Sequence, residues 1–283
     1  DLTDGSLTYS DAILSGSSSR EVMLATYTCH PSMANNELSG PLVNAFLYQR
    51  ITAWPQRRLS FRFVFNPETI GALAYLAENG EHLRENLDAG FVVTCVGDPG
   101  KFTYKRSRRD NTLGDRAMTL ALLNYPESNL LNFFPNGSDE RQYCSPGFNL
   151  PVGVVSRTWP EKSEFYHSSY DNKEYISFER LVETVDLLED ACRILDLNET
   201  YRSLYPYGEP QLSKRDMMET VGAAEGEQHR NRSLKWFLNL ADGKHDLISM
   251  AERSGENFHN LAKAAQLCLK NKLVARCNVN ENK

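Results

Sequence analysis

The sequence of 283 residues contains no long hydrophobic run and no signal-peptide pattern. A helix that crosses a membrane needs about 18 or more mostly apolar residues, and a secretory leader needs a basic start followed by a short apolar segment. Because neither is present, we expect a cytoplasmic protein that has no membrane partner. The first residue is Asp1 and not methionine, so we expect that an N-terminal part of the fold is missing.

The sequence also lacks paired cysteines. Its six cysteines are scattered along the chain, and none belongs to a CxxC motif. In a chain of this length, such scatter is typical of reduced thiols and argues against both a disulfide framework and a structural zinc site made of cysteines. We interpret Cys29 and Cys144 as buried thiols, since no histidine is recognisable as a base for either.

A strongly basic region is absent as well. Residues 213–283 contain 12 Lys and Arg against 9 Asp and Glu, whereas the rest of the chain contains 19 against 28. An acidic main body is a poor surface for a nucleic-acid backbone. The mildly basic tail leaves that question open for the C-terminal part.

Short runs of β-branched and aromatic residues alternate with longer helical patterns up to about residue 200. The predicted strands lie at 22–29, 59–66, 91–97 and 152–159, and the predicted helices at 40–54, 69–87, 112–124 and 178–197. The strands are largely apolar at both odd and even positions, whose side chains point to opposite faces of the sheet. This is expected when helices cover both faces. This order predicts an α/β fold with a mostly parallel sheet flanked by helices. Ser177 and the pair Thr112 and Asp115 are suited to cap the last two helices.

A segment rich in Pro, Gly and Tyr at 201–212 breaks this alternation and predicts a linker. Beyond it the chain has helical patterns at 213–220, 246–253 and 257–270, an apolar segment at 236–240, a Ser254-Gly255 turn and a short strand at 273–277. Helices around a glycine turn, followed by a strand, predict a winged helix-turn-helix. We therefore expect a first domain at 1–200, the linker, and a small C-terminal domain at 213–283.

Four residues of the types that bind metals each follow one of the predicted strands: His30, Glu68, Asp98 and His167. In a parallel sheet the carboxyl ends of the strands share one edge, where ligands bind. Imidazole nitrogen and carboxylate oxygen are normal ligands of zinc. Any one of the four is most simply an ordinary polar residue at a strand end, but together they predict a metal site.

Five ordered segments resemble the motifs of one family: TCHPSMANNELSG (28–40), NPETIGALAYL (66–76), VGDPGKFTYKRSRR (96–109), GSDERQYCSPGF (137–148) and YHSSYDN (166–172). The family is the bacterial aminopeptidase-like branch of the zinc aminopeptidase superfamily, which also includes glutaminyl cyclases. The resemblance covers nearly all of residues 1–200, and the tail is similar to the winged helix usually appended in that branch.

The resemblance implies a role for each matching residue. His30, Asp98 and His167 match metal ligands, and Glu68 matches the general base. The loop residues Asp139, Glu140 and Arg141 are implied to lie at the pocket rim and contact substrate. Asp171 is interpreted as a partner that orients a ligand imidazole.

Two positions depart from the family pattern. Asn36 stands where the family has an aspartate that bridges two metals, and Thr69 stands where it has a second glutamate. Two zinc ions in one pocket need negative charge to offset their repulsion. We therefore expect one zinc ion rather than two. Some of His30, Glu68, Asp98 and His167 would hold it, with Asn36 as a weaker oxygen ligand.

These observations favour a zinc-dependent hydrolase that cleaves a peptide or amide bond of a small substrate through a metal-activated water. One alternative is a non-catalytic binding or scaffold protein that has lost its metals, which Asn36 and Thr69 favour. Another is a transcriptional regulator that senses a ligand. The segment at 257–270 has few of the side chains that read DNA bases, so we expect the C-terminal domain to contact protein or form a homo-oligomer and not to bind nucleic acid.

Overall fold

The computed structural model describes residues 4–212, 215, 217 and 225–277. The chain divides into two compact units, Asp1–Asp196 and Leu197–Lys283.

A seven-stranded sheet with the order β1-β3-β2-β4-β7-β5-β6 forms the centre of the first unit. Its strands are β1 (Ser10–Leu14), β2 (Glu21–Tyr27), β3 (Ser60–Asn66), β4 (Leu87–Val93), β5 (Thr103–Lys105), β6 (Asn129–Leu131) and β7 (Val152–Ser156). The adjacent strands β3, β2, β4 and β7 are parallel, while β1 and β5 run antiparallel to β3 and β7. The predicted mostly parallel α/β sheet is confirmed.

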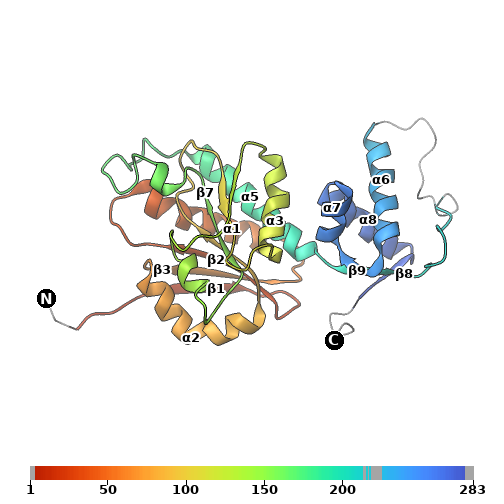
Figure 1. The fold of residues 1–283 in the computed structure, drawn as a ribbon, viewed down its shortest axis with the longest axis horizontal. Coiled ribbons are helices and arrows are strands. Elements are labelled where there is room, and N and C mark those ends of the chain that lie inside the picture. The colour runs from red at the N-terminus through yellow and green to blue at the C-terminus, as the bar shows by residue number, and fades with distance from the viewer. Residues whose placement is uncertain (1–3, 213–214, 216, 218–224, 278–283) are drawn as a thin grey trace. The chain divides into compact units, whose positions relative to one another are not determined.

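Helices cover both faces of this sheet. They are α1 (Ser39–Thr52), α2 (Ile70–Asn86), α3 (Leu113–Ala121), the short α4 (Glu140–Tyr143) and α5 (Phe178–Leu197), with a π-helix at Ala34–Leu38 and 3₁₀ turns at Leu122–Asn124 and Pro160–Lys162. Figure 1 shows α2 on one side of the sheet and α1, α3 and α5 on the other.

The alternation of side chains along each strand explains this arrangement. Phe63 of β3 packs edge-to-face against Tyr48 of α1, whereas its neighbour Val64 joins Ala72 and Tyr75 of α2 in one buried cluster. Successive side chains in a strand point to opposite faces. Strands that are apolar at every position therefore bury both faces, as the sequence predicts.

Both predicted helix caps are present. Thr112 and Asp115 form a capping box at the start of α3, in which each side chain accepts a hydrogen bond from the other residue's backbone N–H. The hydroxyl of Ser177 accepts a hydrogen bond from the backbone N–H of Arg180 at 3.3 Å, in the first turn of α5. These caps satisfy donors that have no partner within the helix.

The second unit is a winged helix-turn-helix, as predicted. It consists of α6 (Glu225–Leu240), α7 (Leu247–Ser254) and α8 (Phe258–Lys270), with an antiparallel sheet of β8 (Thr200–Ser203), β9 (Asp242–Asp246) and β10 (Val274–Arg276) in the order β10-β8-β9. Gly255, at φ 69°, ends α7 in the left-handed conformation that favours glycine.

The boundary of this unit corrects the prediction of a linker at 201–212. Residues 200–203 form β8, the middle strand of the small sheet, and Tyr201 packs edge-to-face against Phe237 of α6. The strand was overlooked because it is short and leads directly into the Pro- and Gly-rich stretch. The predicted helix at 213–220 falls almost entirely outside the described residues.

Within the part of the chain that the structure describes, no helix is long and apolar enough to cross a membrane.

Candidate functional site

The four central strands end side by side at one edge of the sheet, and the segments that follow them carry the predicted site residues. Four non-glycine residues in these segments have positive φ: Ser32 (68°), Thr69 (63°), Cys95 (52°) and His167 (56°). Such a backbone conformation costs roughly 1–3 kcal/mol per residue and is concentrated at functional sites. The strained backbone thus coincides with the edge at which the sequence predicts a site.

Three side chains at this edge form a group that could hold a metal ion. One ligand atom each of Cys29, His30 and Glu68 lies within 4.8 Å of the others, and this is the only such group of three or more His, Cys, Asp and Glu found in the described residues. The ring of His167 is close by, with its centroid 4.5 Å from that of His30. The structure therefore brings together three of the predicted residues, His30, Glu68 and His167.

Glu37 fixes the orientation of His30. Its Oε1 lies 2.8 Å from Nδ1 of His30, and its Oε2 accepts a hydrogen bond from the backbone N–H of Cys29. Glu37 itself is buried. When a carboxylate holds one ring nitrogen of a histidine, the tautomer is set and the other nitrogen is left as the ligand. Nε2 of His30 is therefore the atom that can bind a metal, and Glu37 has the orienting role that the sequence suggested for Asp171.

Asn36 lies beside His30, but its oxygen is engaged elsewhere. Its Oδ1 accepts a hydrogen bond of 3.0 Å from the hydroxyl of Tyr27, and its Nδ2 donates to Oε1 of Glu37 at 2.9 Å. It is this nitrogen that lies 3.3 Å from Nδ1 of His30. An amide N–H cannot coordinate a cation, so the geometry corrects the prediction of Asn36 as an oxygen ligand.

Asp98 is the second correction. Its fully buried carboxylate accepts hydrogen bonds from the hydroxyl of Thr158 at 2.6 Å, from the backbone N–H of Gly100 at 2.8 Å and from Nδ2 of Asn35 at 3.0 Å. These donors satisfy both oxygens and tie together segments far apart in sequence. Asp98 does not belong to the group of Cys29, His30 and Glu68. Its hydrogen bonds stabilise the backbone at this edge of the sheet.

The carboxylate of Asp171 is likewise hydrogen-bonded, in this case to backbone N–H groups. Its two oxygens accept hydrogen bonds from the N–H groups of Asn35 and Asn36, at 2.6 and 2.9 Å. The first N–H of the π-helix Ala34–Leu38 donates to the backbone carbonyl of Asp171, and the carboxylate accepts from the next two. Asp171 therefore caps that helix and thereby sets the position of Glu37.

The loop at 136–141 borders the site, but two of its three predicted substrate-binding residues, Asp139 and Glu140, are buried. Asp139 accepts hydrogen bonds from the backbone of Thr69 at 2.7 Å and from Nδ2 of Asn66 at 2.9 Å, and burial raises the pKa of its carboxyl to about 6. Nε of Arg141 donates to the backbone of Ser138 at 3.0 Å.

Glu140 is the other buried residue of the predicted set. It is fully buried in an ion pair with Lys105, which also donates to the backbone of Asn136 at 2.6 Å, and burial raises the pKa of the Glu140 carboxyl. The predicted contacts of Asp139 and Glu140 with substrate are therefore corrected, because both support the loop from within.

A small pocket of about 200 Å³ opens beside the metal group, and Glu68 belongs to both. The pocket is lined by Tyr27, Glu68, Thr94, Asn136, Gly137, Ser138, Val154, Ser156, Trp159, Pro160, Glu161 and Tyr166. The hydroxyl of Ser138 donates to Oε1 of Glu68 at 3.0 Å. The hydroxyl of Ser156, buried at the pocket wall, has no hydrogen-bond partner among the residues that the structure describes.

Negative charge dominates the pocket. Burial, with the nearby carboxylates of Glu68 and Glu37, raises the pKa of Tyr166 to about 12. Burial likewise raises the pKa of Tyr27 well above its usual value. Both phenols are therefore protonated hydrogen-bond donors at neutral pH, and the surplus of carboxylates favours a cation.

Sequence reasoning missed several of these residues. Cys29 is exposed and not buried as predicted, while Cys144 is buried, as predicted. The signal for Cys29 was its position directly before His30. No sequence signal marked Ser138, Ser156 or Tyr166 as pocket residues, since each reaches the pocket from a separate loop or strand.

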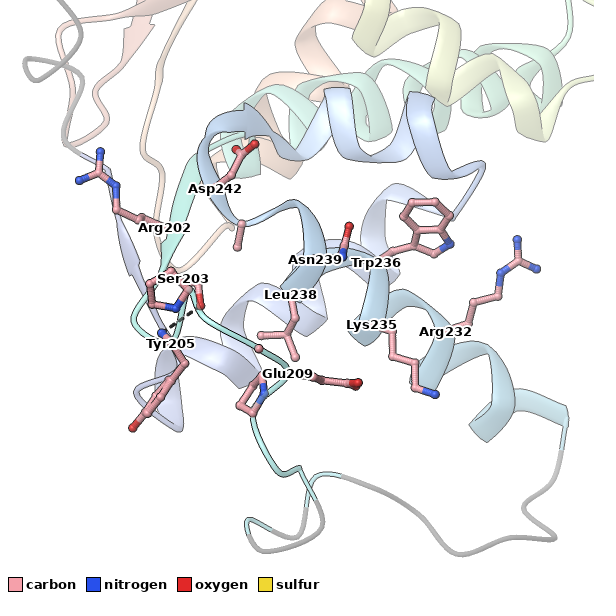
Figure 2. Close-up of a pocket in the computed structure, with 14 residues that line it drawn as sticks. Arg202, Ser203, Tyr205, Glu209, Arg232, Lys235, Trp236, Leu238, Asn239 and Asp242 are labelled. Atoms are coloured by element: carbon pink, nitrogen blue, oxygen red, sulfur yellow. Dashed lines mark hydrogen bonds between the residues drawn. The ribbon is translucent and has the colours of Figure 1, made fainter.

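A second hollow lies within the C-terminal unit, with a volume of about 1240 Å³. Figure 2 shows Arg232, Lys235 and Trp236 of α6 on one side, and Tyr205 and Glu209 of the segment after β8 on the other. Its lining thus combines aromatic rings with charges of both signs.

Comparisons with known families agree with the two-unit division. A family model described as "Domain of unknown function (DUF4910)" matches residues 1–198. A model of a winged helix-turn-helix matches residues 199–276.

Two similar proteins from Clostridium acetobutylicum match nearly all of this chain. A protein named "Putative polysaccharide biosynthesis protein with aminopeptidase-like domain" is 38% identical over 265 residues, which are 93% of this chain and 60% of the relative. A crystal structure described as that of a "putative peptidase" is 36% identical, with a TM-score of 0.89, and the match covers 98% of this chain and 62% of the other. The chain therefore spans about 60% of the length of its relatives.

More distant structures share the fold of the first unit. A zinc aminopeptidase from Bacillus subtilis is 19% identical with a TM-score of 0.53, over 61% of this chain and 45% of that protein. A glutaminyl cyclase from Porphyromonas gingivalis is 14% identical with a TM-score of 0.55, over 66% and 76%. The fold of the chain is thus aminopeptidase-like, as the sequence resemblance predicts.

Proposed function

We propose that this chain, which belongs to the DUF4910 family and has an aminopeptidase-like fold, is a metal-dependent hydrolase that cleaves a peptide or amide bond of a small substrate. The observation that carries the proposal is the position of Glu68. Its carboxylate belongs to the group formed with Cys29 and His30 and also lines the adjacent pocket. A cation and a substrate could therefore meet at this side chain.

The group fits a zinc ion by its chemistry. Imidazole and thiolate are zinc ligands, and a catalytic zinc site keeps one position open for a water. The carboxylate of Glu68 is close enough to both ligand atoms to act on such a water. A zinc ion bound there supplies Lewis acidity toward a carbonyl oxygen. We propose one ion rather than two, because Asn36 is neutral and the carboxylate of Asp98 is already occupied by hydrogen bonds.

Glu68 is suited to move a proton. Ser138 holds Oε1 by a hydrogen bond, which fixes the plane of the carboxylate and leaves Oε2 free. In the proposed reaction Glu68 accepts a proton from the attacking water and delivers it to the leaving amine. The protonated hydroxyl of Tyr166 can donate a hydrogen bond to a substrate oxygen.

The pocket limits the substrate to a small group. Its 200 Å³ lies below the range of roughly 300–1,000 Å³ that holds a drug-sized ligand. Val154 and Trp159 give it an apolar wall, while Thr94 and Ser156 offer hydroxyls. A single amino-acid side chain or a group of similar size is the substrate portion that this space accommodates.

The test uses two variants of the full chain. His30→Ala is expected to lower zinc per chain, measured by mass spectrometry of the metal, because it removes the oriented imidazole. Glu68→Gln is expected to lower hydrolysis of aminoacyl amide substrates by roughly 10²–10⁴-fold, the usual contribution of a general base. His82→Ala is the control, since His82 is bonded to Glu21 instead. Unchanged zinc content in the His30 variant would overturn the proposal.

We further propose that the C-terminal unit contacts a protein and does not bind nucleic acid. Trp236, Tyr205 and Arg232 line its hollow, and Trp, Tyr and Arg are the residue types that contribute most to protein interfaces. A second copy of this chain is one such partner, which sedimentation at increasing concentration would detect. Negligible binding of a mixed-sequence DNA duplex at low salt is expected; tight binding that weakens steeply with salt would contradict the proposal.

The scattered free cysteines support a proposal of cytoplasmic location, since thiols of this kind persist in a reducing compartment.

A further inference from the structure

Cys29 is the one thiol that lies at the proposed metal group. Its Sγ lies within 4.8 Å of a ligand atom of His30 and of Glu68. The residue is exposed, whereas Cys95, Cys144, Cys192 and Cys268 are buried. Its backbone N–H donates to Glu37, the same carboxylate that orients His30. One buried side chain therefore fixes both neighbouring residues of the group.

The two oxygen ligands that the sequence predicts at this edge, those of Asn36 and Asp98, are already hydrogen-bonded within the protein. The oxygen of Asn36 accepts a hydrogen bond from Tyr27 and a weaker one from the thiol of Cys95, and the carboxylate of Asp98 is surrounded by protein donors. A cation beside His30 therefore lacks the two negatively charged oxygen ligands that an aspartate at position 36 and a free Asp98 would supply. The thiolate of Cys29 can supply a negatively charged sulfur ligand in place of one of these oxygens.

We propose that the thiolate of Cys29 coordinates the cation beside Nε2 of His30, next to the carboxylate of Glu68. This inference rests on the proposed function, because it names a ligand of the same site. On binding, the Cys29 thiol releases its proton to solvent and forms a sulfur–metal bond, so that one proton leaves per cation bound. A thiolate ligand makes the site select soft or borderline ions such as zinc and cadmium over magnesium.

The first test is spectroscopic and independent of activity. The metal-free chain is titrated with cobalt(II), and the ultraviolet absorption of a thiolate–cobalt bond is followed together with the visible bands of the bound ion. We expect both in the parent protein. Cys29→Ser should lose the thiolate band and weaken cobalt binding by about tenfold or more, on the scale of changes to a metal's ligand environment. Cys277→Ser, at the other cysteine that is not buried, should keep both.

A second measurement uses the native cysteines. Zinc is expected to slow alkylation of Cys29 by iodoacetamide by about tenfold or more, because a coordinated thiolate is no longer a free nucleophile. Cys277 in the same molecule serves as the internal control, and its rate should not change.

The outcomes separate this inference from the proposed function. Cobalt that binds with visible bands but no thiolate band would overturn the role of Cys29 and leave the metal site standing. Absence of any cobalt or zinc binding by the parent protein would overturn both. Equal protection of Cys29 and Cys277 by zinc would also count against coordination by Cys29.

Discussion

The side chain of Asn36 lies between His30 and the carboxylate of Glu37. Because its amide is neutral, Asn36 adds no negative charge to the site. Its Nδ2 is 2.9 Å from Oε1 of Glu37 and 3.3 Å from Nδ1 of His30. Replacing this N–H donor by an anionic oxygen would place two carboxylates in contact. Like charges at that distance repel strongly in a partly buried site, and a divalent cation relieves the repulsion.

Asn36→Asp is therefore expected to raise zinc affinity by about tenfold or more and to lower the stability of the metal-free protein. Calorimetric titration with zinc and urea unfolding in the presence of a chelator measure the two effects. Asn149→Asp is the matched control, because it adds the same charge at a residue bonded to Arg108 instead. Equal zinc affinity in the parent and the Asn36 variant would mean that position 36 does not sense the cation.

A second residue governs how stability depends on pH. Burial raises the pKa of Asp139 from 3.8 to about 6 in the folded chain. Between these values the folded state binds more protons than the unfolded state, so the contribution of Asp139 to stability falls as the pH rises from about 4 and is lost above about 6. The shift corresponds to roughly 3 kcal/mol.

Asp139→Asn is expected to remove this decline and to raise the free energy of unfolding at pH 7 by roughly 1–3 kcal/mol. The new amide keeps an oxygen for the backbone N–H of Thr69. The unpaired Oδ1 of Asn66 can rotate to accept from the new N–H. Urea unfolding of the metal-free protein at several pH values from 4.5 to 8 checks this. A variant whose stability follows the same pH curve as the parent would contradict it.

At the residue scale, the sequence predicted which residues could bind a metal better than it predicted the hydrogen bonds that engage them. His30, Glu68 and His167 could be found because each follows a strand that the apolar pattern marks. The roles of Asp98 and Asp139 could not be predicted, because the donors that engage them, Thr158 and Thr69, are 60 and 70 residues away in the chain. Only the folded structure shows which carboxylates are already satisfied.

Among the elements, long runs were predicted well and short ones were missed. The four parallel strands and α1, α2, α3 and α5 carry enough apolar residues to establish a period. β5, β6 and β10 have three residues each, and of these only β10 was anticipated. In β1, three of the five residues are exposed: Ser10, Asp11 and Ile13. Such segments become strands only because an existing sheet offers them an edge.

The start of α3 provides a test at this scale. Thr112→Ala removes the side-chain acceptor of the capping box, so the first unit is expected to lose about 1 kcal/mol of stability, the usual value for such a cap. Thr112→Ser keeps the hydroxyl and should stay close to the parent. Urea unfolding followed by the fluorescence of Trp54 and Trp159, both buried in the first unit, measures the difference. Equal losses in the two variants would exclude capping as the cause.

At the scale of the whole molecule, the position of β8 decides where the chain can be cut. β8 is the middle strand of the small sheet, hydrogen-bonded to both β9 and β10. A fragment of residues 197–283 is expected to unfold cooperatively in urea, whereas a fragment of residues 213–283 should not. Without β8 the two outer strands have no partner, and Phe237 loses its contact with Tyr201. Circular dichroism of the two fragments checks this, and a cooperative transition in the shorter one would contradict it.

The positive φ angles of Ser32, Thr69, Cys95 and His167 have a consequence for protein engineering. Glycine adopts such a conformation without the steric cost of a side chain, so a search for thermostable variants should enrich glycine at these four positions. Variants selected for heat resistance alone would then lose side chains from the edge that holds Cys29, His30 and Glu68. Thermal tolerance and the chemistry of that edge are therefore competing traits in this chain, and a selection scheme has to score both.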